Sequence, residues 1–237
     1  RSMVPNNRRR LVDHDWSYRR TLYTSPRIRK LGGTRVIKLL LAMCLISIAP
    51  HAAMAGDFPA LFNVQGVAQN DTLNVRVGPG MEYSITSELN HSETGIEVLQ
   101  SDPSGKWGLI NSGEGIGWIA LRYLQRQPNQ HTGTFPDHLR CFGTEPFWSA
   151  TLDDQSSFES LGEPTKIYPT TTHINSANRT DRFATISQGP SGLMLTTTSV
   201  QACSDGMSDR QYGLSVELLV QDNNDWAQYS GCCSLSR

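Results

Sequence analysis

The sequence predicts an all-β protein built from two β domains. Apolar and polar residues alternate with a period of two in segments such as Leu214-Ser215-Val216-Glu217-Leu218, a pattern typical of strands with one buried face. Clusters of Gly, Asn, Asp and Ser separate these segments, and prolines interrupt the second half of the chain, as expected at turns between strands. No helical periodicity competes there. We therefore expect a small barrel followed by a second β domain.

The beginning of the chain has the features of an exported protein. Two cationic residues precede the apolar run 39–46, and Ala53-Met54-Ala55 gives the small-x-small pattern that signal peptidase cleaves. We expect a signal peptide over residues 34–55, preceded by a basic, disordered extension over residues 1–33. The apolar run is about half of the roughly 20 residues that a bilayer-spanning helix needs. A retained membrane anchor is the alternative to cleavage, and the expected location is periplasmic or secreted.

The net charge of −1 conceals a strong asymmetry along the chain. Residues 1–55 carry eleven Lys or Arg and two Asp, whereas residues 56–237 carry ten Lys or Arg and twenty Asp or Glu, a net charge of −10. Such a surface repels phosphate backbones and anionic lipid headgroups. We therefore expect no nucleic acid partner and no stable membrane span once the signal segment is removed. A cell-wall polymer would be bound by hydrogen bonds and aromatic stacking.

Residues 57–127 are expected to form the first domain, a small barrel of about five strands. Its strand-like runs are 63–67, 73–77, 96–99, 108–110 and 117–121. Gly78-Pro79-Gly80 predicts a turn after the second run, because proline presets φ and a glycine accepts a positive φ. A polar linker over residues 128–137 separates this domain from the next.

Residues 138–237 are expected to form the second β domain. Strand-like runs lie at 147–152, 183–186, 193–198 and 214–220. β-branched Thr and Ile are frequent between them, which favours strands. We see no internal repeat that relates the two domains.

Four cysteines remain after the signal segment, and an even number in an exported chain predicts disulfides. They are Cys141, Cys203, Cys232 and Cys233. A bond between the adjacent Cys232 and Cys233 would be strained, so two pairings are left open. Neighbours on a strand point to opposite faces, so each of these two residues can reach a different partner. Both bonds together would staple the second domain.

Three strings in the first domain identify a family resemblance. Leu73-Asn74-Val75-Arg76-Val77-Gly78-Pro79-Gly80, Lys106-Trp107-Gly108-Leu109-Ile110 and Gly115-Ile116-Gly117-Trp118-Ile119 resemble a bacterial SH3 domain over residues 62–126. The resemblance implies a small SH3-like barrel that acts as a binding module. Domains of this family often offer an aromatic-lined groove to peptides or to peptidoglycan.

Four residues of this domain are candidate ligand contacts. Tyr83 is the first choice, because it follows the turn in a loop, where exposure is expected. Arg76 either holds a carboxylate bidentately or lies on a solvated strand face. Trp118 and Tyr123 complete the set. Trp118, like Trp107, lies within a strand pattern and suits the core as well.

The second domain also carries three distinctive blocks. They are Gly143-Thr144-Glu145-Pro146-Phe147-Trp148, the segment 203–212 that begins Cys203-Ser204-Asp205-Gly206-Met207, and Gly231-Cys232-Cys233. These blocks resemble an uncharacterised family of bacterial exported proteins. The resemblance implies a compact β domain in the cell envelope and no established activity.

The segment 203–212 has a structural and a metal-binding interpretation. Asp205, Ser208 and Asp209 are expected to accept hydrogen bonds from nearby backbone N–H groups. Calcium binding at the two aspartates is the alternative, although the acidic 12-residue loop pattern is absent. Arg210 is expected to pair with Glu145 or with one of these aspartates.

We expect the protein not to be an enzyme, and we assign it no catalytic residue, no metal and no cofactor. An enzyme needs a nucleophile, a base and an orienting group. The candidate nucleophile Cys141, with His138 or His173 as base, is expected in a disulfide.

The expected function is therefore that of a cell-envelope binding protein whose SH3-like module recognises peptidoglycan or a peptide. One alternative is an inhibitor or interaction domain acting on a secreted protein such as lysozyme, since acidity suits a basic target. The other alternative is a cysteine cell-wall hydrolase. The expected partner is peptidoglycan or an envelope protein.

Overall fold

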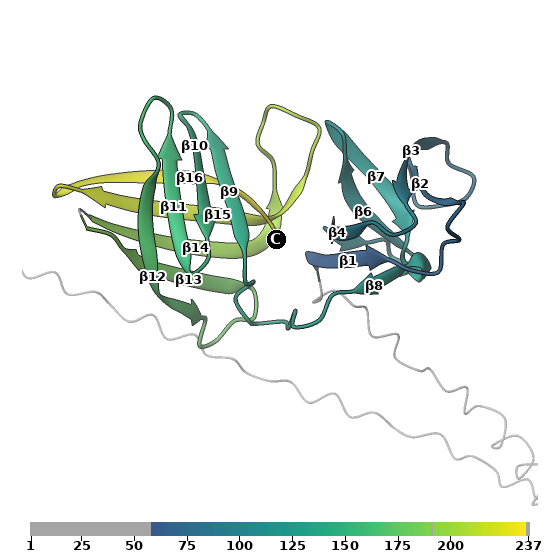
Figure 1. Ribbon diagram of the computed structural model, residues 1–237, viewed down its shortest axis with the longest axis horizontal. Helices are drawn as coiled ribbons and strands as arrows, with labels where there is room; N and C mark the ends of the chain where they lie inside the picture. The colour runs from purple at the N-terminus through teal and green to yellow at the C-terminus, as the bar shows by residue number, and fades with distance from the viewer. Residues whose placement is uncertain (1–57, 191, 236–237) are drawn as a thin grey trace, which may run out of the picture. The chain divides into compact units, whose positions relative to one another are not determined.

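The computed structural model describes residues 58–190 and 192–235, whose ribbon is coloured in Figure 1. Antiparallel strands make up nearly all of the regular structure in these residues, and η1 (Leu121–Tyr123) is a short 3-10 helix. The prediction of an all-β fold is therefore confirmed. The expected basic extension and signal peptide lie outside the described residues.

Residues 58–127, which we name the N-terminal module, form two sheets around a shared core. The sheets have the strand orders β4-β1-β8 and β3-β2-β7-β6-β5. Their strands are β1 (Ala60–Val64), β2 (Thr72–Arg76), β3 (Ile85–Asn90), β4 (Thr94–Val98), β5 (Gln100–Ser101), β6 (Trp107–Ser112), β7 (Gly115–Ala120) and β8 (Leu124–Arg126). Only Leu99 separates β4 from β5, so the chain passes from one sheet to the other at this point.

The core of the N-terminal module follows from the alternation of its strands. In β1 the side chains of Ala60, Phe62 and Val64 are buried while the intervening residues are partly exposed. β2 contributes Leu73 and Val75 in the same way. The expected runs correspond to observed strands, with ends that differ by a few residues. Strand β3 was not predicted, because none of its six side chains is buried and its sequence has no alternating apolar pattern.

Residues 138–235, which we name the C-terminal barrel, form a closed barrel of eight strands. Each strand pairs with the next in sequence, and β16 pairs with β9 to close the barrel. The strands are β9 (Leu139–Thr144), β10 (Phe147–Leu152), β11 (Gln155–Ser160), β12 (Lys166–Asn175), β13 (Arg182–Gln188), β14 (Gly192–Cys203), β15 (Tyr212–Asp222) and β16 (Asp225–Leu235). An eight-stranded barrel has an interior just wide enough for side chains to fill.

The interior of the C-terminal barrel is packed with residues that alternate along the strands. On β15, Leu214, Val216, Leu218 and Val220 are buried, as the period of two predicted. A second group of buried interior residues is polar and consists of Ser156, Thr185, Ser187, Thr196 and Thr198. Strands β11 and β12 were not predicted, because each contains three Ser or Thr residues, whose hydroxyl side chains weaken the apolar signal.

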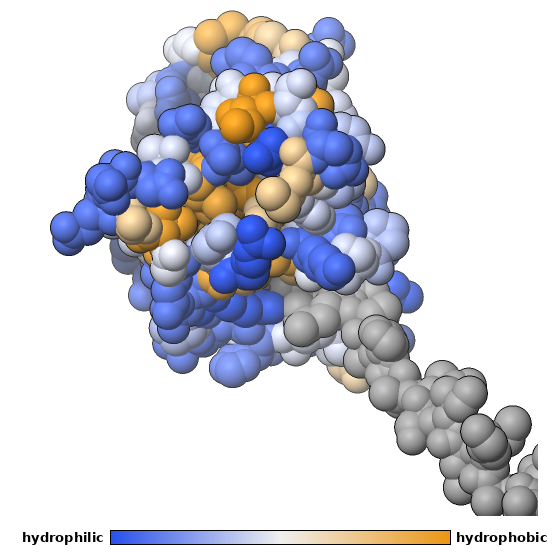
Figure 2. Space-filling model, turned by 90° about the vertical axis from the view of Figure 1, so that its right-hand side faces the viewer, coloured by the Kyte–Doolittle hydropathy of each residue, from blue (hydrophilic) through white to orange (hydrophobic). Residues whose placement is uncertain are grey.

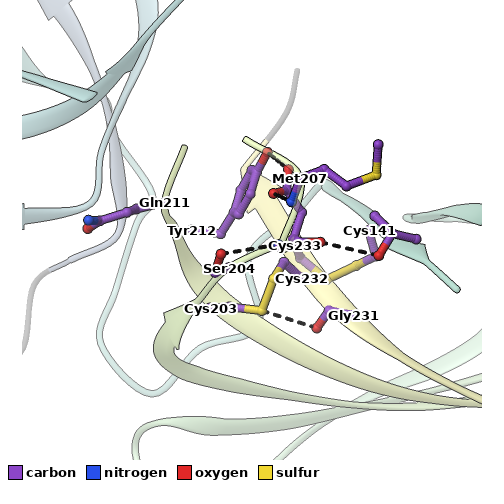
Figure 3. Close-up of a disulfide and its surroundings, with 12 residues drawn as sticks. Cys141, Cys203, Ser204, Met207, Gln211, Tyr212, Gly231, Cys232 and Cys233 are labelled. Atoms are coloured by element: carbon purple, nitrogen blue, oxygen red, sulfur yellow. Dashed lines mark hydrogen bonds between the residues drawn. A yellow bond between two sulfur atoms is a disulfide. The ribbon is translucent and has the colours of Figure 1, made fainter. Parts of the chain in front are cut away.

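The two disulfides join segments that lie far apart in the sequence. Cys141 pairs with Cys233 and Cys203 pairs with Cys232, so the adjacent cysteines reach different partners (Figure 3). Cys141 and Cys233 lie opposite each other on β9 and β16, at the closure of the barrel. The sequence left two pairings open, and the structure selects this one. The prediction of a disulfide-stapled second domain is confirmed.

Candidate functional site

A group of exposed apolar side chains surrounds the Gly78-Pro79-Gly80 turn of the N-terminal module. We name this group the turn surface, and its members are Val77, Met81, Tyr83, Ile85 and Ile116. Figure 2 looks at the side on which β2 and β3 lie in Figure 1, and it shows apolar side chains gathered between hydrophilic ones. Exposed apolar groups with a polar rim commonly mark interaction surfaces.

The ring of Tyr83 lies against the backbone of Gly78. A Cβ atom added at Gly78 would lie only 2.5 Å from the ring, so a larger residue would displace it. The turn is closed by the N–H of Val77, which donates to the carbonyl oxygen of Ser84 at 3.0 Å. Tyr83 is nevertheless 42% exposed. Its ring is thus a supported aromatic platform, suited to stacking on a sugar or a peptide.

Arg76 holds this turn in place. Its Nη1 donates to the carbonyl oxygens of Tyr83 at 2.7 Å and of Met81 at 3.2 Å. The sequence offered two roles for Arg76, a carboxylate ligand or a solvated side chain. These bonds give it a further role as a brace for the loop, while other N–H groups of the guanidinium are left for a ligand. No sequence pattern indicated this brace.

Trp118 lies next to Arg76, whereas Tyr123 lies in other surroundings. Arg76 and Trp118 are opposite each other in the pairing of β2 with β7, and Trp118 is half-buried. Tyr123 packs against the module core, and Arg122 lies over its ring at 4.7 Å. The structure therefore brings Tyr83, Arg76 and Trp118 together around one turn and assigns Tyr123 a packing role. Trp107 is half-buried as well.

Asp205 organises the distinctive segment 203–212. Its carboxylate accepts hydrogen bonds from the N–H groups of Met207 and Ser208, both at 3.0 Å, and from the hydroxyl of Tyr212 at 3.2 Å. The bond from Met207, followed by that from Ser208, holds the pKa of Asp205 below its usual range. These bonds support the structural interpretation of the segment. They also leave little of the carboxylate for a calcium ion.

The same segment contacts the N-terminal module. Asn111 and Gln211 exchange two hydrogen bonds, in which the N–H of Gln211 donates at 3.0 Å and the Asn111 amide donates at 2.8 Å. The N–H of Asp209 donates to the carbonyl oxygen of Glu114 at 3.1 Å. The segment 203–212 thus contributes hydrogen bonds to the junction between the N-terminal module and the C-terminal barrel. Its sequence did not indicate this role.

Glu97 is an ionisable group at this junction. Its Oε1 accepts a hydrogen bond from the N–H of Leu235 at 2.9 Å. Burial raises the pKa of Glu97 to about 7, against the opposing effects of the Leu235 hydrogen bond and the positive charge of Arg210. We expected Arg210 to pair within its own domain, whereas its charge acts on a residue of the N-terminal module. No feature of the sequence singled out Glu97.

The described residues offer neither a thiol nucleophile nor a metal cluster. Cys141 is fully buried and bonded to Cys233, so it does not have the free thiol that a cysteine hydrolase requires. Within residues 58–190 and 192–235, no group of three or more His, Cys, Asp or Glu residues is arranged to hold a metal ion. No helix in the same residues is long and apolar enough to cross a membrane.

Comparisons with known proteins give one distant relative. No protein-family model matches the chain, and no solved structure matches it. The chain is similar to the putative N-acetylmuramoyl-L-alanine amidase YrvJ of Bacillus subtilis (strain 168), with 28% identity over 127 residues, or 52% of this chain. The match covers 23% of the relative's length, so the chain spans about a quarter of that protein.

This comparison corrects one prediction from the sequence. We expected a protein that is not an enzyme, because no set of nucleophile, base and orienting group was evident. The relative is named as an amidase, which is an enzyme, and the expectation is therefore overturned. Sequence patterns identify catalytic residues only where these form a known local motif, and residues brought together by folding escape such a search.

Proposed function

We propose that the protein is an exported, cell-wall-related binding protein whose N-terminal module is SH3-like and recognises peptidoglycan or its stem peptides. The observation that carries this proposal is the supported, exposed ring of Tyr83 within the turn surface. The relative's name, an N-acetylmuramoyl-L-alanine amidase, supports a cell-wall setting. The two disulfides suit an oxidising compartment outside the cytoplasm.

The charge of the chain indicates how such a ligand would be held. Residues 56–237 carry a net charge of −10, which does not attract an anionic wall polymer. Tyr83 and its apolar neighbours would stack on sugar rings or peptide side chains, and free N–H groups of Arg76 would donate to a carboxylate or carbonyl oxygen. Binding of this kind depends weakly on salt, since the stacking contacts are not screened by ions.

Co-sedimentation with isolated peptidoglycan sacculi tests the proposal. We expect the oxidised protein to sediment with sacculi at both moderate and high salt, and Tyr83→Ala to lose at least five-fold in affinity, on the order of 1 kcal/mol from an aromatic contact. Trp226→Ala is the matched control, because Trp226 is an exposed aromatic residue on the barrel hairpin, 50% exposed. Its binding should equal that of the parent protein.

A second variant tests the geometry of the ring without removing it. Gly78→Ala places a methyl group where the Tyr83 ring lies, so it should weaken sedimentation although Tyr83 is retained. If both variants bind sacculi like the parent protein, the turn surface is not the binding site. If the parent protein does not sediment, peptidoglycan is not the ligand.

The relative's name supports a second candidate function, amidase activity on the bond between muramic acid and L-alanine. The same incubation with sacculi tests it by measuring newly exposed amino groups over time. A time-dependent increase would support catalysis, and Cys141 would not be its nucleophile because it forms a disulfide. Binding without any increase would restrict the protein to recognition.

A further inference from the structure

A cavity of about 350 Å³ lies between the N-terminal module, the linker and the C-terminal barrel. Its walls come from β1 and β8, from the whole linker over residues 128–137, and from the barrel residues Phe183, Val200, Leu214 and Leu235. Small-molecule sites commonly have volumes of roughly 300–1,000 Å³ and occur between domains and at the mouths of barrels. This cavity is at the lower end of that range, which suits one small molecule.

The linker forms a fixed wall of the cavity. The Gln130 side chain accepts a hydrogen bond from the N–H of Leu61 at 2.6 Å and donates to the carbonyl oxygen of Leu61 at 2.9 Å. At the other end, the N–H of Phe135 donates to the Asn175 side chain at 2.9 Å. The ring of Phe135 meets that of Phe183 edge-on, with 6.1 Å between the ring centres. The cavity is thus largely preformed.

The lining combines an apolar part with a polar part that includes one arginine. The apolar part consists of Phe58, Pro59, Leu61, Phe135, Phe183, Val200, Leu214 and Leu235. Arg126, His131 and His138 also line the cavity, and Asp137 is the acidic residue among the described lining residues. The Nη2 of Arg126 donates to the carbonyl oxygen of Gln130 at 3.3 Å. The Nδ1 of His138 lies 3.9 Å from the Oδ2 of Asp153. A permanent guanidinium charge beside an apolar wall favours a ligand that carries one anionic group.

We propose that this cavity binds a small amphipathic molecule that has an apolar body and a single anionic group, such as a carboxylate. The apolar body would lie against the phenylalanine and leucine side chains. The anionic group would lie toward the guanidinium of Arg126 and the ring N–H groups of the two histidines. This site is separate from the turn surface, so it is independent of the proposed recognition of peptidoglycan.

Fluorescence titration with 1-anilinonaphthalene-8-sulfonate tests the site, because this probe has an apolar body and one sulfonate. We expect saturable binding with a stoichiometry of about one, and displacement of the probe by decanoate. Decanol has the same apolar chain without the charge and should compete at least five-fold less well. Equal competition by decanol would refute the anionic part of the proposal.

Two variants in one loop locate the bound probe. Thr180 is exposed and lines the cavity, so Thr180→Trp should fill it and weaken probe binding at least ten-fold. Ala177→Trp is the matched control, an exposed position in the same loop that is not part of the lining. Unchanged binding by Thr180→Trp, or equal weakening by both variants, would overturn the proposal. Thermal unfolding of both variants confirms that each one is folded.

Discussion

Individual glycines explain why the distinctive blocks of the second domain have the composition they do. A Cβ atom at Gly143 would meet the Trp148 ring and lie 2.8 Å from the carbonyl oxygen of Ser230. A Cβ atom at Gly231 would collide with the carbonyl oxygen of Phe142 and lie 2.7 Å from Trp148. The Trp148 ring therefore fits over two glycines from two separate blocks.

Gly231→Ala should strongly destabilise the barrel. The added methyl group would meet a backbone carbonyl that cannot move without breaking the pairing of β9 with β16, so we expect a loss of about 3 kcal/mol or more. Gly162→Ala is the control, because a Cβ atom there meets nothing within 4 Å and the cost is limited to a φ of +84°, about 1–2 kcal/mol. Urea unfolding measures both, and equal losses would refute the packing argument.

At the scale of the strands, prediction from sequence succeeded where one face of a strand is apolar and the other polar. The run 147–152 coincides with β10, and the run 214–220 lies within β15. Strand β12 was not predicted, because its apolar residues do not alternate with polar ones and every side chain except that of Tyr168 is partly or fully exposed. Strand β16 was not predicted, because the side chains of its first half are mostly exposed and its second half contains the Gly231-Cys232-Cys233 block.

The two disulfides should differ in their contribution to stability. Cys141–Cys233 closes a sequence separation of 92 residues and Cys203–Cys232 closes one of 29. The chain-entropy model gives each bond about 3–5 kcal/mol, with the longer loop contributing about 1 kcal/mol more. We therefore expect the double Cys→Ala variant of the first pair to have the lower urea midpoint. The reverse order would show that chain entropy does not dominate here.

At the scale of the whole molecule, the contacts between the module and the barrel were beyond prediction from the sequence. Asn111 and Gln211 are 100 residues apart, and so are paired only by the folded structure. The same is true of Glu97 and Leu235, which are 138 residues apart. The candidate residue Tyr83 could be proposed from its place after a turn, whereas the brace from Arg76 required coordinates. The alternative of a lysozyme inhibitor stays a prediction.

Glu97 should make stability depend on pH. Its pKa is raised from 4.5 to about 7 in the folded protein. The stability that its neutral form contributes to the folded protein is therefore fully present below pH 4.5 and is lost as pH rises through 7. Glu97→Gln keeps an oxygen that accepts the Leu235 N–H and removes the charge. We expect the variant to be the more stable protein at pH 8, by up to about 3 kcal/mol.

The measurement is urea unfolding of both proteins at pH 4.5, 6 and 8. The difference between the parent protein and Glu97→Gln isolates this carboxyl from other titrating groups, among them Asp205 and His173, whose pKa values are lowered. If the difference in free energy of unfolding between the two proteins is the same at all three pH values, folding does not raise the pKa of Glu97.

The pairing of β16 with β9 has a consequence for self-association of the protein. A sheet that ends in a free strand exposes unpaired N–H and C=O groups, and these can recruit a strand from another chain into aggregates. In the barrel every strand from β9 to β16 pairs with two neighbours, because β16 pairs with β9. It therefore offers no such template, and self-association through its backbone is suppressed by topology alone.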